Sequence, residues 1–301
     1  MRWAKLRGDL GKYLPISIKN RIRRWMNKRE ASRRTKLRGI AKARYGTFDG
    51  GELFSVLRES GIPEGCVLFV QSSFNDLYTF AGSPLELLAT LRKLVGPSGT
   101  LLMPAFSTNC FAKPPRLFDV TREPTYTGIV NEIFRRSTGV ERSLHPRHSI
   151  CAEGPLAKEL LSGHELCIRA DGPDSPFDRM RRRDDAFILT LGLEPGFVSF
   201  LHWAEDIDPS KLPFPVHVQN PVVCQVKDVE GQILTVKDWT VLPKVAKRLD
   251  VVRFSRHLSF EAMNCWEYKG TAIGLYLVKS LAAELLMLRD KRIIHYCCNG
   301  G

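Results

Sequence analysis

Two short, continuous apolar runs joined by one amphipathic helix constrain the fold of this chain most strongly. The runs are Cys66–Val70 and Thr100–Pro104, and each has the length of a strand covered on both faces. Between them, Ser83 is placed to cap a helix whose leucines recur at helical spacing, and the turn Gly96–Gly99 ends that helix. This order predicts a right-handed crossover between two parallel strands.

The rest of the chain continues the alternation. We expect a helix at Glu52–Ser60, a buried strand at Ala186–Leu191 and a helix at Ser199–Glu205. Apolar and polar residues alternate over Pro221–Val236, which predicts a β-hairpin. Gly270–Leu288 is expected to be a C-terminal amphipathic helix. The predicted fold is therefore a layered α/β/α sandwich with a mixed sheet, plus a basic N-terminal helical extension.

Positive charge is concentrated at the N-terminus. The chain has 45 Lys and Arg against 32 Asp and Glu, and residues 1–45 contain 16 of the basic but only two of the acidic residues. The extension therefore has a net charge of +14, and the remaining residues sum to −1. We accordingly divide the chain into a basic amphipathic extension, residues 1–45, and a main domain, residues 46–301.

The extension interleaves apolar and aromatic residues with Lys and Arg from Trp3 to Met26, and Pro15 is expected to divide it into two short helical pieces. Two interpretations remain open. A basic helix with aromatic residues is suited to lie on an anionic membrane, but it can also cap the main domain and expose a solvated basic face. Nucleic acid is not expected as a partner, because no recognised binding module accompanies the charge. Lys28–Arg44 predicts a linker or a solvent-exposed helix.

The cysteines do not indicate a metal site. Eight are present, and none shows the paired spacing of a zinc site. Cys297 and Cys298 are adjacent and not expected to bridge each other. With no signal peptide and no apolar run of the roughly 18 residues that a membrane span needs, we expect reduced thiols and a cytoplasmic location.

One segment has the composition of a proton-transfer site. If Ser199–Glu205 is helical, His202 and Glu205 at positions i and i+3 point to one face. A carboxylate placed on an imidazole fixes its tautomer and favours its charged form. The same spacing also occurs in ordinary surface pairs, so the motif alone leaves both interpretations open.

Two further segments carry weaker signals. His145 precedes Pro146 and is followed by His148, an arrangement that also suits a loop histidine with only a structural role. Ser72 and Ser73 directly follow the first strand, where hydroxyl and N–H groups can hold a phosphate or a carbonyl, or simply cap a helix. No Gly-x-Ser-x-Gly motif indicates a hydrolase nucleophile.

Together and in this order, the motifs resemble the aminoglycoside 3-N-acetyltransferase family of the antibiotic N-acetyltransferase superfamily. The resemblance covers about residues 50–285 and leaves the extension outside. The matching runs are Val70–Phe74 with Gly96–Pro104, Phe118–Asp119 through Pro124 and Gly128, Arg142–Pro146 with Ser149, Ala152 and Gly154, Asp174–Pro176, and Leu191–Gly192 with Ser199–Glu205.

The resemblance implies direct transfer of an acyl group from acetyl-CoA, as co-substrate, to an amine, with no metal. His202 would be the general base and Glu205 its orienting partner. His145, Ser143 and Ser199 would line the thioester region, where Ser199 can donate to the developing oxyanion. The residues that would line the coenzyme A channel are Ser72, Ser73, Phe74, Ser175 and Pro176.

The chain departs from the family pattern at three positions. Gln71 stands where a histidine often precedes the serine pair, Ser199 where threonine is common, and Glu153 where an aromatic residue commonly precedes the glycine. A main domain of net charge −1 also lacks the acidic surplus expected of an enzyme for polycationic aminoglycosides.

We therefore favour a small-molecule amine acceptor such as an amino sugar, used for example in cell-surface glycan biosynthesis, with the extension in peripheral contact with the inner face of an anionic membrane. The first alternative is aminoglycoside 3-N-acetylation that confers antibiotic resistance. The alternative from another class is a non-catalytic membrane- or polyanion-binding protein on a degenerate transferase fold. A homo-oligomer is compatible with all three.

Overall fold

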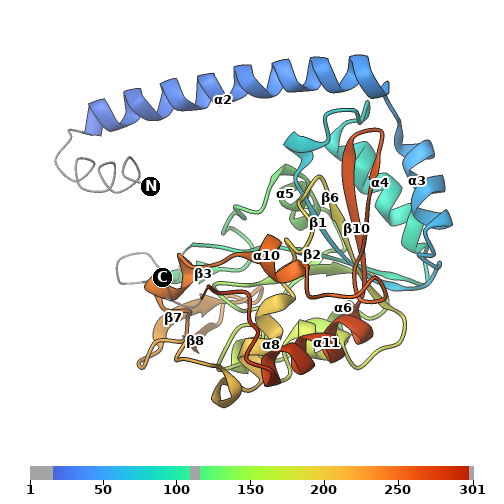
Figure 1. Ribbon diagram of the computed structural model, residues 1–301. Coiled ribbons are helices and arrows are strands. Elements are labelled where there is room, and N and C mark those ends of the chain that lie inside the picture. Colours follow the sequence, from blue (N-terminus) through green and yellow to red (C-terminus); the bar gives the residue numbers. More distant parts are fainter. Residues whose placement is uncertain (1–15, 109–115, 298–301) are drawn as a thin grey trace.

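A seven-stranded mixed sheet forms the centre of the computed structural model, which describes residues 16–108 and 116–297 (Figure 1). The strand order is β4-β5-β2-β1-β6-β10-β9. β2, β1 and β6 are parallel, and the other strands pair antiparallel with their neighbours. The strands are β1 (Val67–Ser72), β2 (Thr100–Pro104), β4 (Glu141–Arg142), β5 (Ile150–Glu153), β6 (Ala186–Leu191), β9 (Asn264–Tyr268) and β10 (Thr271–Leu277).

Helices cover both faces of this sheet, which confirms the predicted α/β/α sandwich (Figure 1). Leu68 and Val70 of β1 pack on one face with α3, α4 and α5, whereas Val67 and Phe69 pack on the other with α6, α7, α8 and α11. The helices are α3 (Gly50–Glu59), α4 (Pro84–Val95), α5 (Ile129–Arg135), α6 (Ala157–Leu161), α7 (Pro176–Met180), α8 (Leu201–Ile207), α9 (Pro243–Ala246), α10 (Val251–Ser255) and α11 (Val278–Asp290), with 3-10 turns η1 (Phe74–Asp76), η3 (His164–Leu166) and η4 (Pro209–Lys211).

The predicted strand, helix, strand unit is present. β1 and β2 pair in parallel, and α4 connects them. Ser83 caps α4 as expected: its hydroxyl accepts the N–H of Glu86 at 3.2 Å, and the Glu86 carboxylate accepts the N–H of Ser83 at 2.6 Å. Gly96 ends the helix at φ +67°, a conformation that L side chains rarely adopt.

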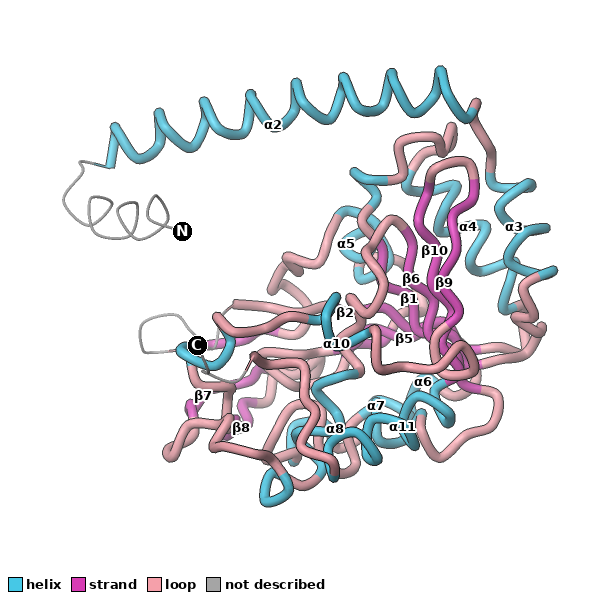
Figure 2. The backbone as a smooth tube through the Cα atoms, in the orientation of Figure 1, coloured by secondary structure: helices cyan, strands magenta, loops and turns pink. Residues whose placement is uncertain are grey.

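A second, three-stranded sheet lies beside the main one (Figure 2). Its hairpin β7 (Val222–Lys227) and β8 (Ile233–Asp238) confirms the predicted β-hairpin, and β3 (Leu117–Asp119) pairs in parallel with β7.

The prediction of one helix over Gly270–Leu288 is wrong in its first half. Thr271–Leu277 is strand β10, which pairs antiparallel with β6 and β9, and α11 begins only at Val278. The β-branched and aromatic residues of Thr271–Leu277 suit a position in a sheet. Gly274 allows close packing there, since a Cβ would lie 2.5 Å from Oγ1 of Thr190.

The N-terminal helix α2 (Ile16–Tyr45) extends along one side of the molecule and beyond its body (Figure 1). The stretch Lys28–Arg44, expected to be a linker or an exposed helix, is part of this helix and is largely exposed. Tyr45 lies against the turn between β9 and β10, because a Cβ on Gly270 would be 2.6 Å from its ring. The predicted break at Pro15 and the residues before it lie outside the described residues.

The six cysteines within the described ranges are free thiols. Cys110 and Cys298 lie outside those ranges. In residues 16–108 and 116–297, no helix combines the length and apolar character that a membrane crossing requires.

Candidate active site

A cavity of about 350 Å³ lies at the carboxyl ends of the three parallel strands β1, β2 and β6. Ligand sites of open α/β sheets form at this edge, because the loops that leave the strands diverge there. Phe106, Leu193 and Phe197 contribute apolar walls. The polar side chains that line the cavity are Gln71, Ser72, Tyr126, Thr127, Asn131, His148, Ser199 and His202.

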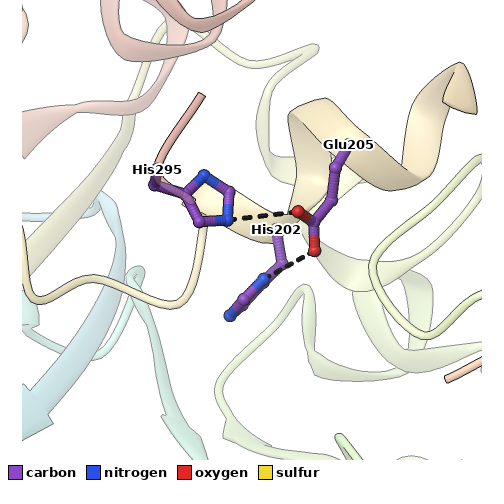
Figure 3. A group of neighbouring side chains, drawn as sticks. All are labelled: His202, Glu205 and His295. Carbon is purple, nitrogen blue, oxygen red and sulfur yellow. Dashed lines mark hydrogen bonds and ion pairs between the residues drawn. The ribbon is translucent and has the colours of Figure 1, made fainter. Parts of the chain in front are cut away.

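His202 and Glu205 lie one turn apart in α8, as their spacing predicted, and their side chains meet (Figure 3). Nδ1 of His202 lies 2.8 Å from Oε1 of Glu205. The imidazole is 25% exposed and lines the cavity, whereas the carboxylate is 3% exposed. Because Glu205 occupies Nδ1, the nitrogen left for a substrate is Nε2.

His202 and Glu205 each stabilise the charged form of the other. Burial alone would lower the pKa of His202, but attraction to the Glu205 carboxylate and the hydrogen bond between them outweigh burial and raise it to about 9. Burial would likewise raise the pKa of Glu205, but the charge of His202 and contact with His295 hold it well below its usual range. At neutral pH the unliganded pair is therefore an imidazolium and a carboxylate.

Two residues near the C-terminal end complete the surroundings of Glu205, and the sequence analysis missed both. Nε2 of His295 lies 3.1 Å from Oε2 of Glu205, and the Tyr296 hydroxyl donates to Oε1 at 3.0 Å (Figure 3 shows the two histidines). Neither residue belongs to a recognisable motif. The one sequence signal is a polar pair, His295-Tyr296, directly between Ile293-Ile294 and Cys297-Cys298.

Gln71 and Ser199, two of the departures from the family pattern, are partners of each other. Oε1 of Gln71 accepts the N–H of Ser199 at 2.8 Å, and Nε2 of Gln71 donates to Oγ of Ser199 at 3.0 Å. The Ser199 hydroxyl therefore keeps its own hydrogen for the cavity, while its N–H is occupied. The buried hydroxyl of Ser72, also on the cavity wall, has no hydrogen-bond partner among the described residues.

Asn131 in α5 lines the cavity and carries a buried acceptor atom without a described partner. Its Nδ2 donates to the carbonyl of Pro104 at 3.0 Å and to Oγ1 of Thr127 at 2.8 Å. These bonds fix the orientation of the amide. Its Oδ1 is buried and has no partner in the described part of the chain, so it can accept an N–H from a ligand.

A second histidine, His148, lines the cavity 6.1 Å from His202, measured between ring centroids. Nδ1 of His148 lies 2.8 Å from Oδ2 of Asp171, and Nη1 of Arg147 lies 3.1 Å from Nε2. Burial and then the charge of Arg147 hold the pKa of His148 well below its usual value, and burial raises the pKa of Asp171 to about 6. With both ring nitrogens occupied, His148 is a neutral wall residue.

The structure places His145 and Ser143 behind the cavity wall, not on it. His145 is fully buried, and burial lowers its pKa to about 3. Its Nδ1 accepts the N–H groups of Arg147 and His148, both at 3.3 Å, so it shapes the loop that carries His148. Ser143 accepts the N–H of Ile150 at 2.9 Å and is also buried.

The remaining predicted coenzyme residues also serve local structure. Ser73 donates to the carboxylate of Asp76 at 2.5 Å, and Phe74 begins the turn η1. Ser175 and Pro176 form the N-terminal cap and first residue of α7. Ser72 is therefore the residue of that predicted set that lines the cavity.

Three side chains of the network have the composition of a metal site. Potential ligand atoms of His202, Glu205 and His295 lie within 4.8 Å of one another. The two carboxylate oxygens are each at hydrogen-bonding distance from an imidazole nitrogen. These contacts allow the carboxylate and the two imidazoles to share protons.

Comparisons with known proteins show which family this chain is similar to. A profile of the family described as aminoglycoside 3-N-acetyltransferase matches residues 69–273. Aminoglycoside N(3)-acetyltransferase IV from Salmonella sp. is 34% identical over 167 residues, 55% of this chain and 60% of that protein. Aminoglycoside N(3)-acetyltransferase III from Enterobacter cloacae is 32% identical over 169 residues, 50% of this chain and 58% of that protein. The chain thus spans about three fifths of the length of these curated relatives.

Solved structures show the same fold. The apoenzyme of aminoglycoside acetyltransferase AAC(3)-IVa is 26% identical and has a TM-score of 0.68, with 84% of this chain and 93% of that chain covered. AAC-IIIb, in a binary complex with CoASH, is 20% identical and has a TM-score of 0.67, with 82% and 97% covered. The profile match spans more than half of the sequence, and the chain therefore belongs to the aminoglycoside 3-N-acetyltransferase family.

Proposed function

We propose that this protein is an acetyl-CoA-dependent N-acetyltransferase that acetylates an amino group of an aminoglycoside, and that residues 46–301 form its acetyltransferase domain. The observation that carries the proposal is the imidazole of His202. Glu205 holds one of its nitrogens, and the other is available to a cavity lined by two serine hydroxyls. Family membership supplies the reaction class, and the relatives' names supply the acceptor.

The reaction needs an amine that has lost its proton. In its neutral form, His202 accepts that proton at Nε2, and the charge of Glu205 stabilises the imidazolium that results. The amine nitrogen then attacks the thioester carbon, and a tetrahedral intermediate forms. When the C–S bond breaks, the thiolate of coenzyme A leaves and takes the proton of the His202 imidazolium. The neutral imidazole then accepts the second proton of the attacking nitrogen, which becomes the amide N–H, and releases that proton to solvent. The acetyl group is thus transferred directly, without an acyl-enzyme.

The hydroxyls of Ser72 and Ser199 are the donors we assign to the oxyanion of this intermediate. Each keeps a hydrogen that no described residue accepts, so the donor is in place before the charge develops. Oδ1 of Asn131 would accept an N–H of the acceptor or of the pantetheine arm. We assign a supporting role to the residues that hold the surrounding loops, namely Ser73, Phe74, Ser143, His145, Ser175 and Pro176.

The comparisons favour an aminoglycoside over the amino sugar that charge alone led us to favour. One observation keeps the amino sugar as a second candidate. Among the described residues, no carboxylate lines the cavity, so compensation for several ammonium groups has to come from elsewhere. An acceptor with a single amine needs less compensation.

A panel of acceptors tests the proposal. Acetyl-CoA turnover is measured by mass spectrometry with aminoglycosides and with nucleotide-linked amino sugars as acceptors, because the eight cysteines interfere with thiol reagents. Acetylation of an aminoglycoside at a rate well above that of the sugars supports the proposal. The reverse preference supports the second candidate, and no turnover with any acceptor contradicts both.

We further propose that α2 contacts an anionic membrane at the cytoplasmic face. In its first turns, Ile18, Ile22, Trp25 and Met26 are spaced four, three and one residues apart and fall on one side of the helix, and they are 41–58% exposed. Ile16–Tyr45 contains 12 Lys and Arg and one acid, Glu30. An exposed apolar stripe in a basic helix matches a surface of anionic headgroups and acyl chains.

Vesicle binding tests the membrane contact. The full chain is compared with a variant lacking residues 1–45, on phosphatidylglycerol vesicles and on neutral phosphatidylcholine vesicles. We expect binding to the anionic vesicles only, weakened by salt and lost in the truncated protein. The double variant Ile22→Ser, Trp25→Ser should bind more weakly than the control Ile40→Ser. Undiminished binding of the truncated protein would contradict the proposal.

A further inference from the structure

We propose that His295 and Tyr296 are positioning residues, which hold the Glu205 carboxylate against His202 and share its negative charge. The proposal rests on the proposed function, since it assigns a role in the reaction to the segment that follows α11. Both residues lie beyond the part of the chain that matches the family profile, residues 69–273. The proton-transfer group would thus be completed by a segment outside the family motifs.

The geometry gives each carboxylate oxygen its own partners. Oε1 of Glu205 is 2.8 Å from Nδ1 of His202 and accepts the Tyr296 hydroxyl at 3.0 Å. Oε2 lies 3.1 Å from Nε2 of His295 (Figure 3). The rings of His202 and His295 meet edge to face, with centroids 5.2 Å apart. The carboxylate is therefore enclosed between two imidazoles and a phenol.

The backbone fixes this segment in place. The N–H of Asp250 donates to the carbonyl of His295 at 2.8 Å, and the N–H of Cys297 donates to the carbonyl of Arg248 at 2.9 Å. Tyr296 pairs with Leu249 in an antiparallel bridge. Its ring also packs in a small apolar cluster with Val216, Val245 and Ile294. These contacts hold the two side chains at the carboxylate without any contribution from a ligand.

Both side chains are neutral: the Tyr296 hydroxyl donates to Oε1, and His295 places Nε2 3.1 Å from Oε2. Burial lowers the pKa of His295 and raises that of Tyr296, so neither carries a charge near neutral pH. A neutral donor stabilises the Glu205 carboxylate and draws charge away from the oxygen that faces His202. Removing it leaves more negative charge on that oxygen, and the His202 proton is then held more tightly.

Other charged groups also act on this site. Asp206 on α8 and Asp171 in the loop after η3 favour the charged form of His202. The neutral His148 ring lies 6.1 Å from His202 between centroids, and the guanidinium of Arg147 contacts His148. Arg289 of α11 donates to the carbonyl of Ala204. These groups remain in every variant below, so a change in the titration of His202 reports on the substituted donor.

An NMR titration of the His202 imidazole in the full-length protein tests the proposal without requiring turnover. The variants are Tyr296→Phe, His295→Leu and His295→Gln, the last of which keeps an N–H donor. Tyr276→Phe is the matched control, because this buried hydroxyl bonds the N–H of Gly196 and not Glu205. The same proteins are then assayed for kcat/KM against pH.

Tyr296→Phe and His295→Leu should each raise the titration midpoint of His202 by about half a unit to one unit, since one hydrogen bond to a charged group changes a pKa by about that amount. His295→Gln and Tyr276→Phe should leave it near the wild-type value. The acid limb of the kcat/KM against pH profile should shift by the same amount as the NMR titration midpoint of His202. An unmoved midpoint in both donor-deleting variants would overturn the proposal, whatever the activity. A shifted midpoint in a protein without transferase activity would uphold the network and overturn the proposed function.

Discussion

At the residue scale, the cavity is defined by which polar atoms remain available to a substrate. Gln71 occupies the N–H of Ser199, and Glu205 occupies Nδ1 of His202. The atoms left on the described cavity wall include Nε2 of His202, the hydroxyls of Ser72 and Ser199, and Oδ1 of Asn131. One base, two donors and one acceptor are what an acyl transfer to an amine needs.

Replacing His202 by alanine should lower kcat by about 10² to 10⁴, the usual contribution of a positioned general base. The fold should persist, because the imidazole is partly exposed and packs on the cavity side of α8. Steady-state kinetics and circular dichroism on the same preparation check this. A folded His202→Ala protein that retains full turnover would exclude His202 as the base, and the non-catalytic alternative predicts no turnover in wild type either.

The pH profile should reflect the raised pKa of His202. The base must be neutral to accept a proton, and its pKa is about 9, so kcat/KM should rise with pH through a midpoint near pH 9 and level off only above it. The pKa of His202 is raised and not lowered, because the Glu205 carboxylate stabilises the protonated imidazole. Two acceptors whose amines differ in pKa separate this titration from that of the substrate. If the midpoint of the kcat/KM profile changes only with the pKa of the acceptor amine, the assignment of His202 as the titrating base is contradicted.

At the scale of elements, α8 is held on three sides. Nε1 of Trp203 donates to Asp178 at 3.1 Å and so ties α8 to α7, whose N-terminal cap is Ser175. Leu201 and Trp203 pack into the same apolar cluster as α11. The C-terminal segment reaches Glu205 from the remaining side. This packing keeps His202 directed at the cavity even though α8 is only seven residues long.

The cap of α4 gives a prediction for the crossover unit. Ser83→Ala removes one half of the capping box and should lower the free energy of unfolding by about 1 kcal/mol. Ser55→Ala, at an exposed position within α3, is the matched control and should change stability by less than about 0.5 kcal/mol. Urea unfolding of both variants measures the difference. Equal midpoints would show that the cap contributes little.

At the scale of the whole molecule, a buried ion pair joins the two sheets. Arg147 lies between β4 and β5 beside His148, and Asp238 ends β8 of the small sheet. Their side chains meet at 2.5 Å and 3.1 Å, and both are almost fully buried. Burial would raise the pKa of Asp238, but the guanidinium outweighs burial and lowers it to about 2. The small sheet therefore supports one wall of the cavity through Arg147.

Asp238→Asn should lower the free energy of unfolding by about 3 kcal/mol, because it leaves a buried guanidinium without its counter-charge. The exposed pair Lys279–Asp184 offers a control, and Asp184→Asn should cost less than about 1 kcal/mol. Thermal unfolding of the two variants provides the comparison. If Asp238→Asn were as mild as Asp184→Asn, the pair would not hold the sheets together.

Local patterns in the sequence determined much of this protein. Apolar runs and a capping serine were enough to predict β1, α4, β2 and β6, because their lengths and periodicity reflect burial within one element. The His202 and Glu205 spacing predicted their contact for the same reason, since one helical turn joins them. The resemblance to the family predicted Ser199 for the thioester region and Ser72 for the coenzyme A channel, and the structure places both on one cavity.

Only the tertiary structure decided the rest. Thr271–Leu277 was expected to begin the C-terminal helix, but its pairing with β6 and β9 makes it a strand. His145 precedes His148 by three residues, yet only His148 lines the cavity, because the loop turns the first imidazole into the core. His295 and Tyr296 lie about 90 residues from Glu205 along the sequence. No local period links residues that far apart, and it is backbone pairing with residues 248–250 that brings them to the carboxylate.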